Sequence, residues 1–148
     1  MLMIEKTDNT KWRGVMKRNR IIITVLALIL LGGVAYGMNY AINYSYYQKV
    51  MGTVIIEPVD ISSISDGLYT GSFDAKITAA TVGITVKDGE ITDIDLIKHK
   101  HDEGAQAVTI IDDVLGEQSL EVDVVSGATN SSNTILKAIE VALKSDPK

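Results

Sequence analysis

A long uncharged run near the N-terminus constrains this chain more than any other feature. No charged residue occurs from Ile21 to Gln48, and the part from Ile21 to Met38 is almost wholly apolar. An α-helix rises about 1.5 Å per residue, so a hydrocarbon core of about 30 Å requires roughly 20 residues. The run is long enough, and we expect residues 21–43 to form a transmembrane helix.

The residues on either side of this run predict its orientation. Basic side chains precede it, at Arg13, Lys17, Arg18 and Arg20, and tyrosines crowd its other end, at Tyr36, Tyr40, Tyr44, Tyr46 and Tyr47. Basic residues stay on the cytoplasmic side of a membrane, and aromatic rings lie at headgroup level. We therefore predict that residues 1–20 form a cytoplasmic basic tail that need not fold, and that the rest of the protein is extracytoplasmic.

A cleaved signal peptide is the alternative to this anchor. The small residues Gly33-Val34-Ala35 are of the kind that a signal peptidase requires. The apolar run is longer than the roughly 7–15 residues typical of a signal peptide, however, and this favours an uncleaved single-pass anchor in the cell membrane.

Charge and cysteine content exclude several classes of function. The first 20 residues carry six basic and two acidic side chains, so the remainder must hold −9 to give the net charge of −5. An acidic domain repels nucleic acid, whose phosphates require clustered Lys and Arg. The chain has no cysteine, which excludes disulfides, thiolate metal sites and thiol nucleophiles.

The remaining residues predict a connector and one small domain. Residues 44–65 form the connector, in which Pro58 disfavours a long helix. The domain, residues 66–148, begins with segments rich in β-branched and aromatic residues, which predict strands over 68–75, 78–86 and 90–98. Asp88-Gly89 is typical of a tight hairpin between the second and third strands.

The second half of the domain predicts two helices and one further strand. Apolar residues at spacings of three and four indicate a helix over 105–115, which Gly116 would end. Residues 120–125 are expected to form a short strand, and a final helix should run to Leu143. The expected order is β-β-β-α-β-α, an α+β domain with a small antiparallel sheet and two helices.

The stretch that carries the most chemistry is Asp123-Val124-Val125-Ser126-Gly127-Ala128-Thr129. It joins the predicted fourth strand to the final helix, and a helix start offers unpaired backbone N–H groups and a positive dipole to a phosphate. The same residues have a purely structural interpretation, because Ser, Thr and Asn are good N-caps and Gly suits a turn. Spacing alone leaves both interpretations open.

This stretch resembles the flavinylation signature of the FMN-binding domain family, Asp-x-x-Ser/Thr-Gly-Ala-Thr followed by Ser or Thr, and Ser131 and Ser132 supply the last position. The wider likeness includes an Asp-Gly-x-Tyr-x-Gly opening at Asp66, the hairpin from Val86 to Asp93, and Gln118-Ser119. The family includes the covalently flavinylated subunits of the Rnf and sodium-pumping NADH:quinone oxidoreductase complexes.

The resemblance implies that FMN is attached through its phosphate to the Thr129 hydroxyl by a separate Mg²⁺-dependent transferase that uses FAD. Ser126, Gly127 and Ala128 would lie beside the cofactor, with Ser126 equally well explained as a turn residue. Asp123 would serve recognition by the transferase or a local hydrogen bond. The segment after the third strand lies near the flavin in this family, so a contact from His99 or the region of Gly104 is conceivable.

Other polar residues are better explained by solvent exposure. His99 and His101, with Asp102 and Glu103, resemble metal ligands in spacing, but a polar loop at a strand end explains them, and we expect no metal site. Asp93 and Asp95 share a strand face, which is expected to be solvated rather than catalytic.

Two functions follow from the sequence. The first is a membrane-anchored flavoprotein that carries electrons on the extracytoplasmic face, exchanging them with a membrane redox complex or an extracytoplasmic acceptor. This would be a relay or a redox-complex subunit more than a stand-alone enzyme. The second is a membrane-tethered interaction module of the same fold without covalent flavin.

Overall fold

The computed structural model describes residues 9–101 and 104–147, with side chains from residue 19 onward. The chain divides into two units between Ala41 and Ile42. Helix α1 (Asn9–Met51) supplies all of the described part of the first unit and the first ten residues of the second.

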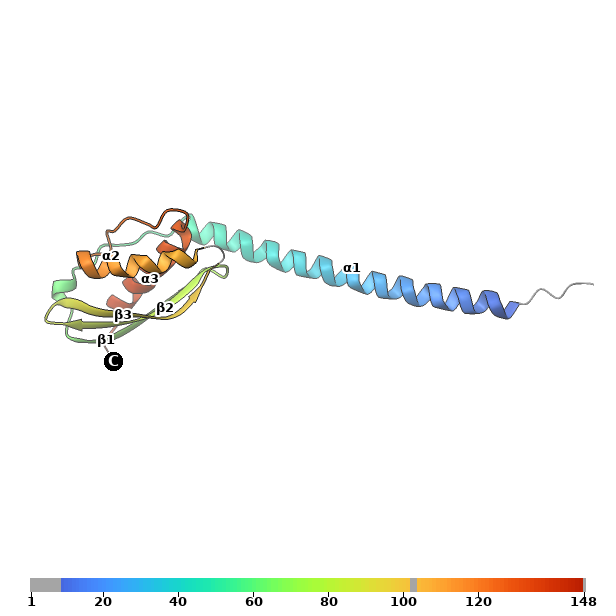
Figure 1. The fold of residues 1–148 in the computed structure, drawn as a ribbon, viewed down its shortest axis with the longest axis horizontal. Coiled ribbons are helices and arrows are strands. Elements are labelled where there is room, and N and C mark those ends of the chain that lie inside the picture. Colours follow the sequence, from blue (N-terminus) through green and yellow to red (C-terminus); the bar gives the residue numbers. More distant parts are fainter. Residues whose placement is uncertain (1–8, 102–103, 148) are drawn as a thin grey trace, which may run out of the picture. The chain divides into compact units, whose positions relative to one another are not determined.

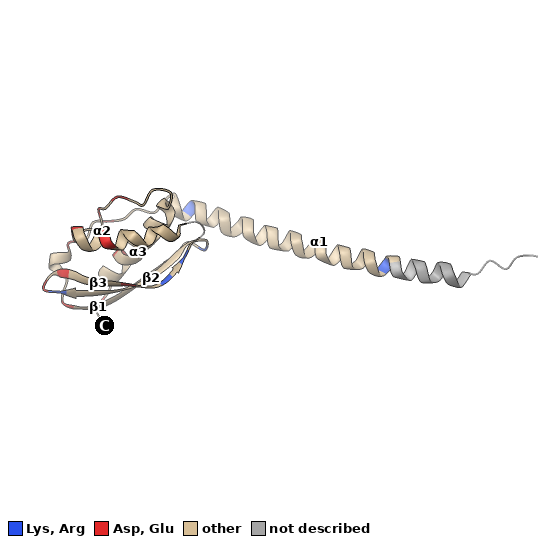
Figure 2. Cartoon of the chain, in the orientation of Figure 1, with Lys and Arg blue, Asp and Glu red and all other residues tan. Residues whose placement is uncertain are grey.

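Helix α1 is long and apolar enough, from Asn19 to Met51, to cross a membrane. Its most apolar stretch is not buried by the protein at all. Over the part of α1 whose side chains are described, Lys and Arg occur only near the two ends (Figure 2). A membrane anchor and a signal sequence share these properties. The predicted transmembrane segment, residues 21–43, lies wholly within this helix.

The helix extends beyond the predicted segment at both ends. Residues 9–20, for which the sequence shows no periodicity, are helical, and so are residues 44–51 of the predicted connector. The helix ends where Gly52 N–H donates to the Gln48 carbonyl at 3.0 Å, well before Pro58. The rest of the connector is irregular apart from the 3₁₀ turn η1 (Ile61–Ser63).

Three antiparallel strands form one sheet in the order β1-β2-β3 (Figure 1). They are β1 (Gly67–Asp74), β2 (Ala79–Lys87) and β3 (Glu90–Lys100). Asp88 and Gly89 have φ of 54° and 77°, the pair of positive values that a type I′ hairpin requires. The predicted tight hairpin is therefore confirmed.

Irregular pairing between β2 and β3 explains why both faces of β3 carry apolar residues. The register shifts between Thr85 and Val86, so that Ile91 and Ile94, three residues apart, are both buried. A regular strand would place them on opposite faces. Asp93 and Asp95 are exposed, as expected for a solvated face.

Helices cover one face of the sheet (Figure 1). The short 3₁₀ helix η2 (Ala105–Thr109) leads into α2 (Ile110–Glu117), which lies against β3, while α3 (Thr129–Leu143) lies against β1 and β2. The core between the layers includes Val82, Ile84, Ile110, Val114, Ile135 and Ile139. The predicted α+β class with a small antiparallel sheet is confirmed.

The segment predicted as a fourth strand, residues 120–125, is not a strand. The sheet ends at β3. At its edge, the Gln118 side chain forms the hydrogen bonds with the Ile91 backbone that a further strand would otherwise form. Its Oε1 accepts the Ile91 N–H at 2.7 Å, and its Nε2 donates to the Ile91 carbonyl at 2.9 Å. The alternating apolar residues instead anchor a loop, with Leu120 buried in the core.

Replacing Gln118 with Ala should therefore loosen the contact between the end of α2 and β3. We expect the free energy of unfolding to fall by about 1–3 kcal/mol, because three partly buried backbone groups, the N–H and carbonyl of Ile91 and the carbonyl of Leu115, lose this partner. Urea unfolding followed by circular dichroism measures this loss. Gln106→Ala is the matched control: that side chain is exposed and donates one hydrogen bond, so an equal loss in both variants would contradict the explanation.

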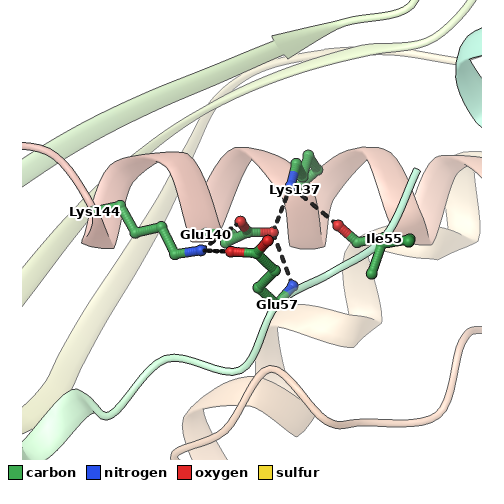
Figure 3. Close-up of polar contacts among 5 residues, drawn as sticks. All are labelled: Ile55, Glu57, Lys137, Glu140 and Lys144. Carbon is green, nitrogen blue, oxygen red and sulfur yellow. Dashed lines mark hydrogen bonds and ion pairs between the residues drawn. The ribbon is translucent and has the colours of Figure 1, made fainter. Parts of the chain in front are cut away.

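A buried carboxylate ties the connector to α3 (Figure 3). Glu140 is 3% exposed and accepts hydrogen bonds from Lys137 Nζ and Lys144 Nζ, each at 2.8 Å. It also accepts the backbone N–H of Glu57 at 3.1 Å, and Lys137 Nζ donates to the carbonyl of Ile55 at 3.0 Å. Lys144 forms a second ion pair with Glu57.

This network predicts a loss of stability in acid. Burial opposes ionisation of Glu140, but the hydrogen bonds from Lys137 and Lys144 outweigh it and lower the pKa of Glu140 below its ordinary 4.5. A carboxyl group whose pKa is lower in the folded than in the unfolded protein stabilises the fold at any pH above its unfolded-state pKa. This stabilisation is lost as the pH falls through its folded-state pKa. The melting temperature should therefore decrease as the pH falls below 4.5, and it should decrease less in Glu140→Gln. Identical melting temperatures of the two proteins across this pH range would contradict the prediction.

Candidate functional site

The residues before α3 form a tight turn. Ala128 N–H donates to the Val125 carbonyl at 2.9 Å, and Gly127 has φ of 77°. A positive φ at the third residue is the pattern of a type II turn, and glycine adopts it without a Cβ penalty. Gln106 Nε2 donates to the Ser126 carbonyl at 2.9 Å and holds the turn against η2.

Among the residues that the structure describes, no side chain caps the first turn of α3. Its N-cap is Ala128, and no side chain hydrogen-bonds there. The predicted capping residues, Thr129 and Asn130, instead form the first turn of the helix and are exposed. The N–H groups of a first turn have no partner within the helix, so the interpretation of this sequence as a well-capped helix start is wrong.

Hydrogen bonds of buried hydroxyl groups hold the start of α3 in place. Ser132 is fully buried, and its Oγ accepts the Val125 N–H at 3.1 Å. Thr134 Oγ1 lies 2.8 Å from Thr78 Oγ1 and donates to the Asn130 carbonyl at 2.7 Å. The turn and the first helical turn are therefore held in a fixed relation to β2.

A cavity of about 350 Å³ lies at this helix start. It is lined by Tyr47, Thr78, Gly104 and the consecutive residues Gly127, Ala128, Thr129, Asn130 and Ser131. The backbone of Gly104 lies very close to Ser131: a Cβ added at Gly104 would be 2.1 Å from Ser131 Oγ. None of the lining residues within the described ranges 9–101 and 104–147 is charged, although the domain as a whole is acidic.

The structure brings together three of the five predicted site residues. Gly127, Ala128 and Thr129 line the cavity, whereas Ser126 is exposed in the turn and does not line it. Asp123 lies in a separate acidic hollow of about 360 Å³ with Asp113, Glu117, Glu121 and Val122. Acidic residues accordingly mark α2 and the segment after it (Figure 2).

His99 and His101 lie side by side at the end of β3, with ring centroids 4.9 Å apart. Burial, and then the neighbouring His101, lower the pKa of His99. Asp102 and Glu103, which completed the expected polar loop, lie outside the described residues. Over residues 9–101 and 104–147, no group of three or more His, Asp or Glu side chains is placed to hold a metal ion.

Sequence reasoning did not assign Tyr47, Thr78 or Asn130 to the site. The sequence alone indicates for Tyr47 only a place in an aromatic belt, and for Thr78 a place in a strand. For Gly104 the family resemblance implies only a region near the flavin. Asn130 is the chain neighbour of Thr129, but nothing local in the sequence links Tyr47, Thr78 or Gly104 to Thr129, because the tertiary fold alone brings them to one cavity.

Residues 76–144 match the model of the FMN-binding domain family. This segment of the globular unit is therefore similar to the family, in agreement with the resemblance of the sequence. The matched segment includes Thr129 and the whole turn before it. Together with α1, it gives a chain that combines an FMN-binding domain with a helix fit for a membrane anchor.

A curated relative, an uncharacterised protein of Treponema pallidum (strain Nichols), is 30% identical to this chain over 91 residues. The similar region covers 56% of this chain and 24% of the relative, so the chain spans about a quarter of that protein's length. No solved structure matches the chain significantly.

Proposed function

We propose that this protein is a membrane-anchored electron-transfer flavoprotein whose FMN is linked by a phosphoester to Thr129. The observation that carries the proposal is the position of Thr129. It is the exposed first residue of an uncapped helix, inside the segment matched by the FMN-binding domain family, and it lines the cavity of about 350 Å³.

The residues that line the cavity fit a bound FMN phosphate. The unpaired N–H groups of the first turn and the positive end of the α3 dipole would compensate phosphate charge. Gly127 and Ala128 add little bulk to the cavity wall, and a cavity of this size is within the roughly 300–1,000 Å³ of ligand sites. Bound flavin would supply one- and two-electron transfer, while the chain would hold and orient it.

Attachment requires a partner enzyme. A Mg²⁺-dependent transferase would break the pyrophosphate of FAD, join the FMN phosphoryl to Thr129 Oγ1 and release AMP, with the hydroxyl proton lost to solvent or base. Asp123, exposed in the acidic hollow, would contribute to recognition by this enzyme. The anchor would place the domain outside the cytoplasm, where a membrane redox complex or an extracytoplasmic acceptor would exchange electrons with it.

Intact mass measurement tests the proposal. The full chain, co-expressed with a flavin transferase of this class, should be yellow and heavier than the polypeptide by one FMN less one water. Fragmentation should place the added mass on the peptide that contains Thr129. Colourless protein of unmodified mass, alongside a control domain that the same transferase does modify, would contradict it.

A further inference from the structure

Tyr47 differs from every other described tyrosine of α1 in its burial. It is 7% exposed, whereas Tyr44 and Tyr46 are 45% and 46% exposed. Asn43, Tyr47, Val50 and Met51 are the least exposed residues of the last turns of α1, and their spacing of three and four defines one helix face. Met51 Sδ lies 4.0 Å from Thr134 Oγ1 of α3, so this face packs within the globular unit.

Tyr47 is buried outside the continuous hydrophobic core cluster, with its ring centroid 6.2 Å from that of Tyr44. The continuous core cluster includes Tyr69 but not Tyr47. Tyr47 instead lines the cavity at the start of α3, where the other lining residues are small or polar. A large aromatic ring at the wall of a cavity otherwise lined by small or polar residues is typical of a site for a flat aromatic ligand, because aromatic rings favour offset or edge-on contact with each other.

We propose that Tyr47 forms the aromatic wall of the flavin site and contacts the isoalloxazine ring of the FMN on Thr129. The inference rests on the proposed function and adds to it a residue from α1, outside the segment that matches the family. Thr129 holds the phosphate at one side of the cavity, and Tyr47 supplies the surface for the ring. The last turns of the apolar helix are therefore part of the cofactor site.

Flavin fluorescence tests this contact without any activity measurement. A phenol in contact with photoexcited isoalloxazine donates an electron to it and then recovers that electron, which quenches emission. Leucine and phenylalanine side chains donate far less readily. In the full-length flavinylated protein in detergent, Tyr47→Leu and Tyr47→Phe should each raise the emission per flavin several-fold.

Tyr46→Leu is the matched control, since Tyr46 is the next residue and is exposed. Its emission should equal that of the unsubstituted protein. Tyr47→Phe keeps the ring volume and decides the question if Tyr47→Leu fails to fold. Intact mass must first show one FMN on each protein that is compared.

Three outcomes would overturn the inference. Emission that is unchanged in Tyr47→Phe, with the adduct complete, would mean that Tyr47 does not contact the ring. An equal rise in Tyr46→Leu would mean that the effect is not specific to the cavity. Absence of an adduct in the unsubstituted chain would overturn the proposed function itself, and the inference with it, and mass distinguishes this case from the other two.

Discussion

Thr129→Ala should abolish covalent flavin, taking the modified fraction from nearly complete to undetectable after co-expression with the transferase. The substitution removes the hydroxyl that would accept the phosphoryl group and leaves the cavity otherwise intact. The fold should not suffer, because the Thr129 side chain is exposed. Alanine favours a helix over threonine by a few tenths of a kcal/mol to about 0.7 kcal/mol, so the melting temperature should be unchanged or slightly higher.

Two variants make this result specific to one hydroxyl. Thr129→Ser keeps a hydroxyl at the same position and should retain modification in part or in full. Ser126→Ala removes the hydroxyl in the adjacent turn and should leave the added mass in place. An adduct that persists in Thr129→Ala, or that disappears only in Ser126→Ala, would move the attachment site away from Thr129.

Gly71→Ala should destabilise the domain more than any other single methyl addition in the sheet. A Cβ at Gly71 would lie 2.2 Å from the Ala138 carbonyl oxygen and 2.4 Å from the Ala142 nitrogen. Both are backbone atoms of α3, so neither can turn away as a side chain would. Overpacking typically costs about 1–3 kcal/mol, and more where the backbone must move. We expect a loss at or above the upper end.

Gly83→Ala is the matched control on the neighbouring strand. Gly83 pairs with Thr70, and a Cβ there would lie 3.5 Å from Ile97 Cδ1, an ordinary contact. Its free energy of unfolding should change little. Thermal unfolding measures both variants, and for a domain of this size 1 kcal/mol corresponds to roughly 4–8 °C. Equal melting temperatures would contradict the close packing of α3 on β1.

The close approach at Gly71 also gives a physical reason for the Asp-Gly-x-Tyr-x-Gly opening. Asp66 Oδ1 accepts the Asp88 N–H at 2.8 Å and ties the start of β1 to the hairpin. Tyr69 is 2% exposed in the core, and its hydroxyl donates to the Ser65 carbonyl at 2.6 Å. Gly71 then admits α3, whose first residue is Thr129. The motif therefore contributes to placing the helix that carries the candidate attachment residue.

Features with local causes could be predicted from the amino-acid sequence alone. The length of the uncharged run from Ile21 to Gln48 predicted the apolar helix, and Asp88-Gly89 predicted the hairpin. The residues before Thr129 predicted a turn followed by a helix. Each depends on the conformational or hydrophobic preference of a few neighbouring residues, so a single sequence suffices. The match to the FMN-binding domain family over residues 76–144 agrees with this part of the prediction.

Contacts between residues far apart in the chain became evident only from the folded protein. Residues 120–125 alternate like a strand, but Gln118 already satisfies the edge of β3 at Ile91, and no ladder forms. Tyr47 resembles its neighbouring tyrosines in sequence, yet it alone among the described tyrosines of α1 lies at the cavity with Thr129. Such contacts depend on packing between segments far apart in the chain, and residue patterns within one segment carry no information about them.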